Sequence, residues 1–257
     1  MTPSWRIRTS TSPELLQELR EEEIRTVAAR IPAGARILEV GAGTGTQARW
    51  LGEHGFGVLA IDLPGAVGPE AQVFPVAVYD GVRFPVGDAS QDVVFSSNVL
   101  EHVTDLPRLH AEARRVLRPG GLCLHVLPSG TWAFWEAVTY YPGVGPSVAR
   151  RTVATVRRGD GPWWRRVWSA VRFLAPRVVP RRHGARGVLL TEPVVFSRRA
   201  WVPHFRRHGW VVEEVLPLGV FYTGRSMLDT RLDLRARRRL ARVLGSSSIL
   251  YCLRPGP

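Results

Sequence analysis

The feature that most constrains the fold is a glycine-rich junction in residues 37–51, ILEVGAGTGTQARWL. The apolar run at its start predicts a buried strand, and residues 47–51 continue as a helix. Gly41, Gly43 and Gly45 let backbone amides approach a ligand, because glycine has no Cβ. A dinucleotide fingerprint would need glycine or alanine where Thr46 stands, so the turn alone also fits a tight connection without a ligand.

The next apolar segment, residues 57–63, strengthens the ligand-binding interpretation. It ends at Asp62, about twenty residues beyond Gly41, where a carboxylate can accept hydrogen bonds from ribose hydroxyls. The alternative role of Asp62 is to cap a loop. The turn before it favours the ribose role.

Strand and helix patterns alternate along most of the chain, which predicts a parallel sheet covered on both faces. A helix with an apolar stripe is expected at residues 13–30, and strands are expected at 37–40, 58–62, 73–78, 93–96, 122–127, 210–216 and 248–253. We therefore expect one α/β domain over residues 1–257. Its expected parts are a cofactor-binding core at 13–130, an insertion at 131–200 and C-terminal strands at 201–257.

Four sequence blocks between about residues 30 and 130 resemble the class I S-adenosylmethionine-dependent methyltransferases of type 11. They are the glycine-rich block, the strand that ends at Asp62, YDGVRFPVGDASQDVVFSSNVLEHV at 79–103, and EARRVLRPGGLCLHVLPS at 112–129. The resemblance implies a Rossmann-like, doubly wound sheet of seven strands, mostly parallel, with an antiparallel last strand. It also implies a helical segment inserted between strands 5 and 6, and S-adenosylmethionine as the cofactor.

The resemblance further implies which residues face this cofactor: Glu39, Gly41, Ala42, Gly43, Gly45, Asp62, Leu63, Asp80, Gly81 and Asn98. Glu39 and the glycine turn would face the methionine part, and Asn98 would line the cofactor through its backbone. Asp80 and Gly81 would meet the adenine amino edge, since a carboxylate only accepts hydrogen bonds and glycine leaves room for a flat base. The alternative for this pair is an ordinary Asp-Gly turn.

Methyl transfer to a hydroxyl requires alignment, exclusion of water and removal of one proton. His102 is the first candidate for the general base, because an unperturbed imidazole has a pKa near neutrality. The alternative is that His102 packs against or caps the following helix. Other candidates lie in or beside the insertion: Tyr140, Tyr141, His183 and Glu192.

No metal is expected from the sequence. Some quinone-pathway O-methyltransferases share the LEH segment and hold a divalent ion through Glu101, His102 and an acidic residue at the position of Asn98. Asn98 breaks that set here. No other group of residues has the spacing of metal ligands.

Charge is distributed unevenly around a formal net value of +13. Residues 1–130 contain 12 arginines and 15 acidic residues, whereas residues 131–257 contain 23 and 7. All 35 basic residues are arginine, which indicates a compositional bias and explains part of the high charge. The basic half is the half outside the methyltransferase blocks.

The insertion combines arginine pairs with aromatic residues. Residues 145–188 contain 11 arginines, one acidic residue and three tryptophans. A helix at 163–175 would place Trp164, Val167, Trp168, Val171 and Leu174 on one face. This pattern is typical of an interfacial helix, and it also fits an amphipathic helix packed on its own domain. We expect contact with an anionic membrane surface or a lipid-linked substrate, and rank nucleic acid lower because the NPPY-type signature is absent after the fourth strand.

Cys123 and Cys252 lie in apolar runs and predict buried free thiols in a reducing compartment. The N-terminal residues lack a secretory h-region, and no apolar run approaches the length of a spanning helix. We therefore expect a cytoplasmic protein, peripheral on the inner face of the membrane.

The expected function is S-adenosylmethionine-dependent methylation of a small-molecule acceptor, most plausibly a sugar, lipid-linked or isoprenoid-type hydroxyl. The alternatives are an RNA-directed methyltransferase, an NAD-dependent oxidoreductase, and a non-catalytic protein that retains the cofactor fold.

Overall fold

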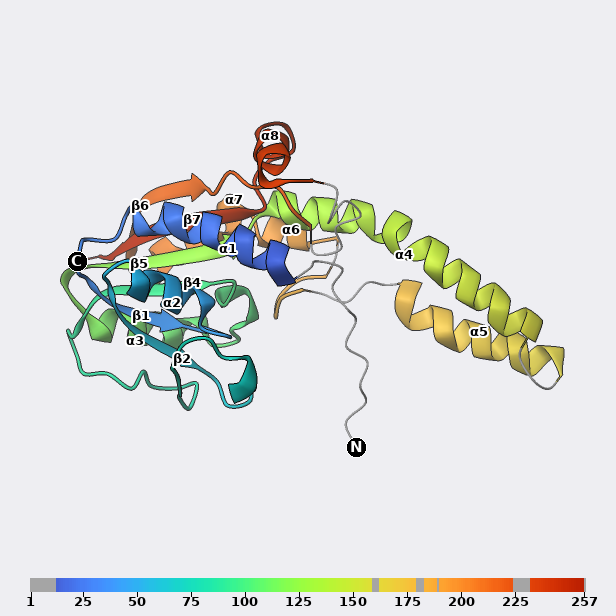
Figure 1. The fold of residues 1–257 in the computed structure, drawn as a ribbon, viewed down its shortest axis with the longest axis horizontal. Helices are drawn as coiled ribbons and strands as arrows, with labels where there is room; N and C mark the ends of the chain where they lie inside the picture. The colour runs from blue at the N-terminus through green and yellow to red at the C-terminus, as the bar shows by residue number, and fades with distance from the viewer. Residues whose placement is uncertain (1–12, 159–161, 179–182, 189, 224–231, 257) are drawn as a thin grey trace.

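A seven-stranded sheet forms the centre of the protein (Figure 1). The computed structural model describes residues 13–158, 162–178, 183–188, 190–223 and 232–256. The strands are β1 (Arg36–Val40), β2 (Gly57–Asp62), β3 (Val76–Val78), β4 (Gln91–Ser97), β5 (Leu117–Pro128), β6 (Trp210–Pro217) and β7 (Ser248–Pro255). Their order in the sheet is β3-β2-β1-β4-β5-β7-β6.

The pairing of the strands confirms the expected fold class. Strands β1 to β5 pair in parallel, and β7 runs antiparallel between β5 and β6. β3 is shorter than the expected strand at 73–78. Val73 instead donates its backbone N–H to Thr44 in the glycine-rich turn, at 2.8 Å, so the chain pairs with the turn before it joins the sheet.

The helices lie on both faces and in the insertion. They are α1 (Pro13–Ala28), α2 (Thr46–Glu53), α3 (Leu106–Val116), α4 (Gly130–Arg158), α5 (Trp163–Val178), α6 (Glu192–Val195), α7 (Arg198–Arg207) and α8 (Leu234–Leu244), with short 3₁₀ turns η1 (Pro69–Ala71) and η2 (Leu100–His102). α1 ends two residues before the expected limit at residue 30.

The core divides into two layers because side chains alternate along each strand. Leu38 and Val40 of β1 pack in one cluster with residues of α3 and α7. Ile37 belongs to the other cluster, with residues of α1 and α2. Both cysteines are buried as free thiols, as the sequence predicts. Because these two layers cover the faces of the sheet, a ligand can bind at its edge, where the loops that follow the carboxyl ends of the parallel strands gather.

The insertion between β5 and β6 forms a long helical arm, as expected. α4 leaves the end of β5, and α5 returns alongside it, so that the pair extends away from the sheet (Figure 1). α6 and α7 then lead the chain back to β6. None of the helices in the described ranges has the length and hydropathy needed to cross a bilayer.

Two tyrosines, Tyr251 in β7 and the partly buried Tyr222 beside it, predict opposite responses to loss of a hydroxyl. Tyr251 is fully buried, and its hydroxyl has no hydrogen-bond partner among the described residues. We expect Tyr251→Phe to leave the free energy of unfolding unchanged or to raise it by about 1 kcal/mol, because an unsatisfied buried group is removed. Urea denaturation monitored by circular dichroism measures this change.

Tyr222→Phe is the matched control. The Tyr222 hydroxyl donates to Glu23 Oε1 at 2.9 Å and pairs with Ser248 Oγ at 2.7 Å. Its removal leaves buried partners unpaired and is expected to cost about 1–3 kcal/mol. A larger loss for Tyr251→Phe than for Tyr222→Phe would contradict this assignment.

Candidate functional site

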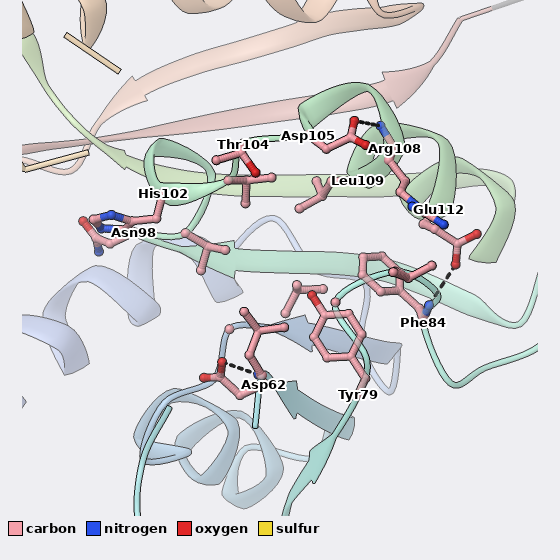
Figure 2. A pocket seen from close by; sticks show the side chains of 17 residues that line it. Asp62, Tyr79, Phe84, Asn98, His102, Thr104, Asp105, Arg108, Leu109 and Glu112 are labelled. Carbon is pink, nitrogen blue, oxygen red and sulfur yellow. Dashed lines mark hydrogen bonds between the residues drawn. The ribbon is translucent and has the colours of Figure 1, made fainter. Parts of the chain in front are cut away.

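A cavity of about 400 Å³ opens at the carboxyl ends of β1, β2 and β4. Its wall includes the ends of β1 and β2, the loop after β3, the loop after β4 and the first turns of α3. Asp62 and Tyr79 lie on one side of it, and Asn98 and His102 lie together at one end (Figure 2). This is the edge that the glycine-rich block predicted.

The glycine-rich turn is tied directly to the end of β2. The backbone N–H groups of Gly41 and Ala42 both donate to the carbonyl of Ile61, at 2.9 and 3.1 Å. Gly41 has a φ of 73°, and a Cβ at this position would lie 2.4 Å from Cγ2 of Val99. Only glycine fits this close approach.

The second half of the turn is held by the carboxylate of Asp62. Gly43 donates its N–H to Asp62 Oδ2 at 2.7 Å, and Leu63 donates to Oδ1 at 2.7 Å. Gly43 and Gly45 adopt φ of 56° and 77°. A Cβ on Gly43 would meet nothing within 4 Å, which leaves open space above the turn for a ligand.

Glu39 lies beneath this turn and carries an unsatisfied polar atom. Its side chain is 2% exposed, and Oε2 has no hydrogen-bond partner among the described residues. Burial raises the pKa of Glu39 to about 8, and the nearby charge of Asp62 adds to the shift. Neither Glu39 nor Asp62 forms an ion pair with a described residue. The two carboxyl groups therefore fit a positively charged ligand, as the sulfonium and ammonium groups of S-adenosylmethionine would be.

The proposed adenine residues divide between the cavity and the surface. Gly81 lines the cavity, and a Cβ there would lie 2.9 Å from Leu63 Cδ2. Asp80 lies outside the lining, and its Oδ1 accepts from the backbone of Val82 at 2.8 Å and of Arg83 at 2.9 Å. These bonds lower the pKa of Asp80. Asp80 therefore forms the turn that was the alternative interpretation, and its contact with adenine stays a prediction.

The lining residues that the sequence analysis did not identify include two aromatic ones. Tyr79 lines the cavity beside Phe84, with ring centroids 5.8 Å apart in an edge-to-face arrangement. Both are conspicuous apolar residues in the block at 79–103, but their direction depends on the loop after β3. They provide an apolar wall suited to a flat base.

Asn98 faces Arg20 of α1, which the sequence analysis also missed. With its amide oxygen turned toward the guanidinium, Asn98 accepts from Nη1 at 2.6 Å and Nη2 at 3.0 Å. Arg20 also pairs with Glu23 at 2.7 Å. Asn98 has a φ of 55°, and its backbone N–H donates to the carbonyl oxygen of Val126 in β5 at 2.9 Å. The turn after β4 is therefore held by α1 through Arg20 and by β5 through Val126.

Next to Asn98, Glu101 and His102 place an acid and an imidazole at the cavity. Glu101 is buried, and neither carboxylate oxygen has a hydrogen-bond partner among the described residues. Burial raises the pKa of Glu101 to about 7. His102 Nε2 lies 3.8 Å from Glu101 Oε1, its side chain is half exposed, and burial lowers its pKa. His102 thus lines the cavity as a neutral imidazole at neutral pH.

The insertion returns a second imidazole to the same place. The ring of His183 lies 5.2 Å from that of His102 and 4.5 Å from that of Trp132. The backbone N–H of His183 donates to Glu192 Oε1 at 2.5 Å. Burial lowers the pKa of His183 to about 4, so this ring is also neutral. Of the four alternative sequence candidates, His183 therefore lies close to His102, and Glu192 holds the backbone of His183.

The other two candidates, Tyr140 and Tyr141, lie on α4. Tyr140 is buried on α4. The side chain of Tyr141 lies outside the described part of the chain. The absence of a metal stays a prediction, because donor atoms of Glu101, His102 and His183 lie within 4.8 Å of one another.

Comparison with known proteins agrees with this geometry. A family model described as a methyltransferase domain matches residues 38–125. An uncharacterized methyltransferase of Mycobacterium sp. (strain KMS) is 32% identical over 173 residues, which cover 58% of this chain and 68% of that protein. The malonyl-[acyl-carrier protein] O-methyltransferase of Serratia marcescens is 40% identical over 95 residues, which cover 35% of this chain and 37% of that protein.

A solved structure extends the likeness over most of the fold. The S-adenosylmethionine-dependent methyltransferase from Mesorhizobium loti has a TM-score of 0.51 and 20% identity, covering 91% of this chain and 97% of that chain. The chain belongs to the class I S-adenosylmethionine-dependent methyltransferases. It is an enzyme with S-adenosylmethionine as its cofactor, which confirms the expected donor and sets aside the NAD-dependent alternative.

The position of Glu39 predicts a pH-dependent affinity for the cofactor. If the cationic cofactor is held by ionised Glu39, binding requires loss of the proton that the free enzyme carries below about pH 8. The affinity for S-adenosylhomocysteine, which has the same amino acid end, should then rise by up to about tenfold per pH unit between about pH 6 and 7.5. Calorimetric titration at several pH values measures this slope.

Glu39→Gln provides the control, because an amide does not titrate. Its affinity should be weaker at pH 7.5 and nearly independent of pH over the same range. Equal slopes in the wild type and in Glu39→Gln would contradict the role given to this carboxyl group.

Proposed function

We propose that the enzyme methylates a hydroxyl group of a small-molecule acceptor, with His102 as the general base. The observation that carries this proposal is a neutral, half-exposed imidazole in the wall of the cofactor cavity, with the carboxyl group of Glu101 beside it. A carboxyl acceptor would need no base at neutral pH, whereas a hydroxyl must lose a proton as the new bond forms.

In this proposal S-adenosylmethionine supplies a methyl group already activated by its sulfonium. The chain has three tasks. The glycine turn, Glu39 and Asp62 hold the donor, and His102 accepts the hydroxyl proton. Glu101, 3.8 Å from His102 Nε2, favours the imidazolium that results, since a negative charge stabilises a positive one in a poorly solvated site.

The insertion supports the same chemistry from the other side. His183 packs between Trp132 and Phe196, with ring centroid distances of 4.5 and 6.3 Å. Its neutral ring has hydrogen-bonding capacity for an acceptor hydroxyl, and the aromatic neighbours limit access of water. We therefore assign the acceptor subsite to the space bordered by His102 and His183.

Replacement of His102 tests the proposed base. We expect His102→Gln to lower turnover by about 10²–10⁴-fold, the range for loss of a general base, and to change cofactor affinity little. Transfer of labelled methyl from S-adenosylmethionine to a cell metabolite extract, separated into aqueous and organic phases, measures turnover. The affinity for S-adenosylhomocysteine is measured by calorimetry on the same preparations.

The pH profile and the product distinguish the alternatives. A base at His102 gives an acid limb of kcat/KM below about pH 6.5, whereas Glu101 as base gives a limb near pH 7. His54→Gln, a surface substitution on the far side of α2, is the control. Unchanged turnover in His102→Gln would exclude His102 as the general base. A product whose labelled methyl group is released by mild alkali is a methyl ester. In that case the acceptor group is a carboxyl group and the proposed hydroxyl acceptor is wrong.

We also propose that the acceptor is sugar-based, lipid-linked or isoprenoid-type and is met at an anionic membrane surface on the inner face of the membrane, with the arm of α4 and α5 as the contact. Three tryptophans of α5 support this: Trp163, Trp164 and Trp168 are 70%, 52% and 61% exposed. Val167 and Val171 on the same helix are also exposed. Among residues 163–172 of α5, whose side chains the structure describes, Ala170 is the buried one.

The charges on the arm fit this surface. Arg165, Arg166 and Arg172 lie on α5, and Arg165 stacks over the ring of Trp164 at 5.2 Å. Tryptophan favours the headgroup region, and each arginine near an anionic bilayer contributes on the order of 1 kcal/mol. The arginine pair at 181 and 182 lies outside the described residues.

A paired substitution on the arm tests the membrane contact. We expect the variant with Trp164→Ser and Trp168→Ser to lose at least about tenfold in partition to vesicles of phosphatidylcholine and phosphatidylglycerol, because the interfacial anchors are removed. Vesicle flotation measures partition. Val243→Ser on α8, an exposed apolar residue outside the arm, is the matched control.

Varying the salt concentration and the lipid charge separates the contribution of the arginines to vesicle binding from that of the tryptophans. Partition should weaken when phosphatidylglycerol is omitted or salt is raised, since the arginines act through screened charge. A wild-type protein that stays in the soluble fraction contradicts the membrane contact. Binding to generic RNA with a steep salt dependence, in place of vesicles, would favour the nucleic-acid alternative.

A further inference from the structure

Three histidines gather on the far side of α3 from the cofactor cavity. His110 lies on α3, His204 lies on α7, and His208 follows the last turn of α7. Arg108, Leu109 and Glu112 of α3 line the cavity, whereas His110 faces α7. These histidines are therefore separate from the donor site and from the group formed by Glu101, His102 and His183.

The imidazoles converge closely enough to share one ion. His110 Nε2 lies 3.0 Å from His204 Nε2, and one donor atom from each of the three rings lies within 4.8 Å of the others. Two imidazole nitrogens bound to one tetrahedral zinc ion at 2.0–2.1 Å lie about 3.3 Å apart. The pair thus already has nearly the separation of two ligands, and rotation of the His208 side chain completes the set.

The hydrogen bond of His208 suits coordination. His208 Nδ1 lies 2.8 Å from the carbonyl oxygen of His204, which accepts its proton and leaves Nε2 with a free lone pair. A hydrogen bond of this kind is what orients metal-bound histidines in proteins.

Packing alone does not explain the three histidines, because the hydrogen bonding of His110 is incomplete. His110 is fully buried, its ring hydrogen bond joins it to another imidazole, and its Nδ1 has no partner among the described residues. The neighbouring His125 differs, because its two ring nitrogens pair with Ser96 Oγ at 2.8 Å and Cys123 Sγ at 3.1 Å. An ion would replace the single contact between His110 and His204 with two coordinate bonds.

The surroundings determine which ion fits. Arginines lie around the cluster: Arg114 near His110, and Arg186 and Arg207 near His204. Magnesium and calcium require oxygen ligands, usually anionic ones. Neutral imidazoles suit zinc, nickel, copper and cobalt, which form strong bonds to nitrogen. His204 and His208 are partly exposed, which gives the ion access and leaves room for a water as fourth ligand.

We propose that His110, His204 and His208 bind a divalent transition metal ion of the zinc type, which links α3 to α7. The ion stabilises the end of the insertion where it rejoins the sheet, because α7 leads directly into β6. This role is independent of the methylated acceptor.

Metal titration of the full chain without a histidine tag tests the proposal. After treatment with a chelator and desalting, the wild type should bind one equivalent of Zn²⁺ by calorimetry, and Co²⁺ should give the visible absorption of a tetrahedral site. Zn²⁺ should raise Tm, and Mg²⁺ at the same concentration should not. His204→Gln and His208→Gln should each weaken Zn²⁺ binding about tenfold or more and abolish the rise in Tm.

His183→Gln is the matched control, because it removes an imidazole from the other histidine group. It should bind Zn²⁺ as the wild type does. Circular dichroism establishes that all variants are folded, and the partly exposed positions 204 and 208 are used because replacement of buried His110 risks unfolding. The proposal is overturned if the wild type binds no Zn²⁺, if both α7 variants bind it unchanged, or if binding is lost in His183→Gln instead.

Discussion

The interaction on which the site depends is the attachment of the glycine turn to the end of β2. The carbonyl of Ile61 accepts two N–H groups from the turn, and Asp62 accepts a third from Gly43. The same turn touches Val99 so closely that no Cβ fits on Gly41. The ends of β1, β2 and β4 are therefore fixed relative to one another before any ligand binds. A backbone cradle of this kind reduces the ordering that binding must otherwise supply.

Two buried carboxyl groups with raised pKa values divide this edge of the sheet into two functions. Glu39 lies under the turn, beside Asp62, and Glu101 lies after β4, beside His102. Each is costly to ionise in isolation, so each is poised to respond to positive charge that arrives nearby. In the proposed mechanism, the charge near Glu39 belongs to the donor, and the charge near Glu101 arises on the imidazole of His102 as it takes up a proton. Donor binding and proton transfer would then be served by the ends of two adjacent strands, β1 and β4.

Local patterns predicted the fold well, because strand alternation, the glycine turn and the strand end at Asp62 are encoded within short stretches. The predicted sites were less complete where distant segments meet. Arg20 reaches Asn98 from α1, and His183 reaches His102 from the end of the insertion. The family resemblance implies that Asp80 meets adenine, and this stays a prediction, because the structure shows the Asp80 carboxylate accepting hydrogen bonds within its own turn. The His110 group joins residues that lie 94 positions apart in the sequence, and the sequence analysis did not identify it.

The return of the insertion to the sheet makes one very tight contact. A Cβ on Gly184 would lie 2.6 Å from the carbonyl oxygen of Glu101, and the next residue, Ala185, donates its N–H to that oxygen at 2.7 Å. The outer parts of α4 and α5 extend away from this junction (Figure 1). Changes in the length of these helices are therefore compatible with the fold as long as position 184 keeps a residue without a Cβ. Acceptor preference can diversify in this way while the donor half of the enzyme remains unaltered.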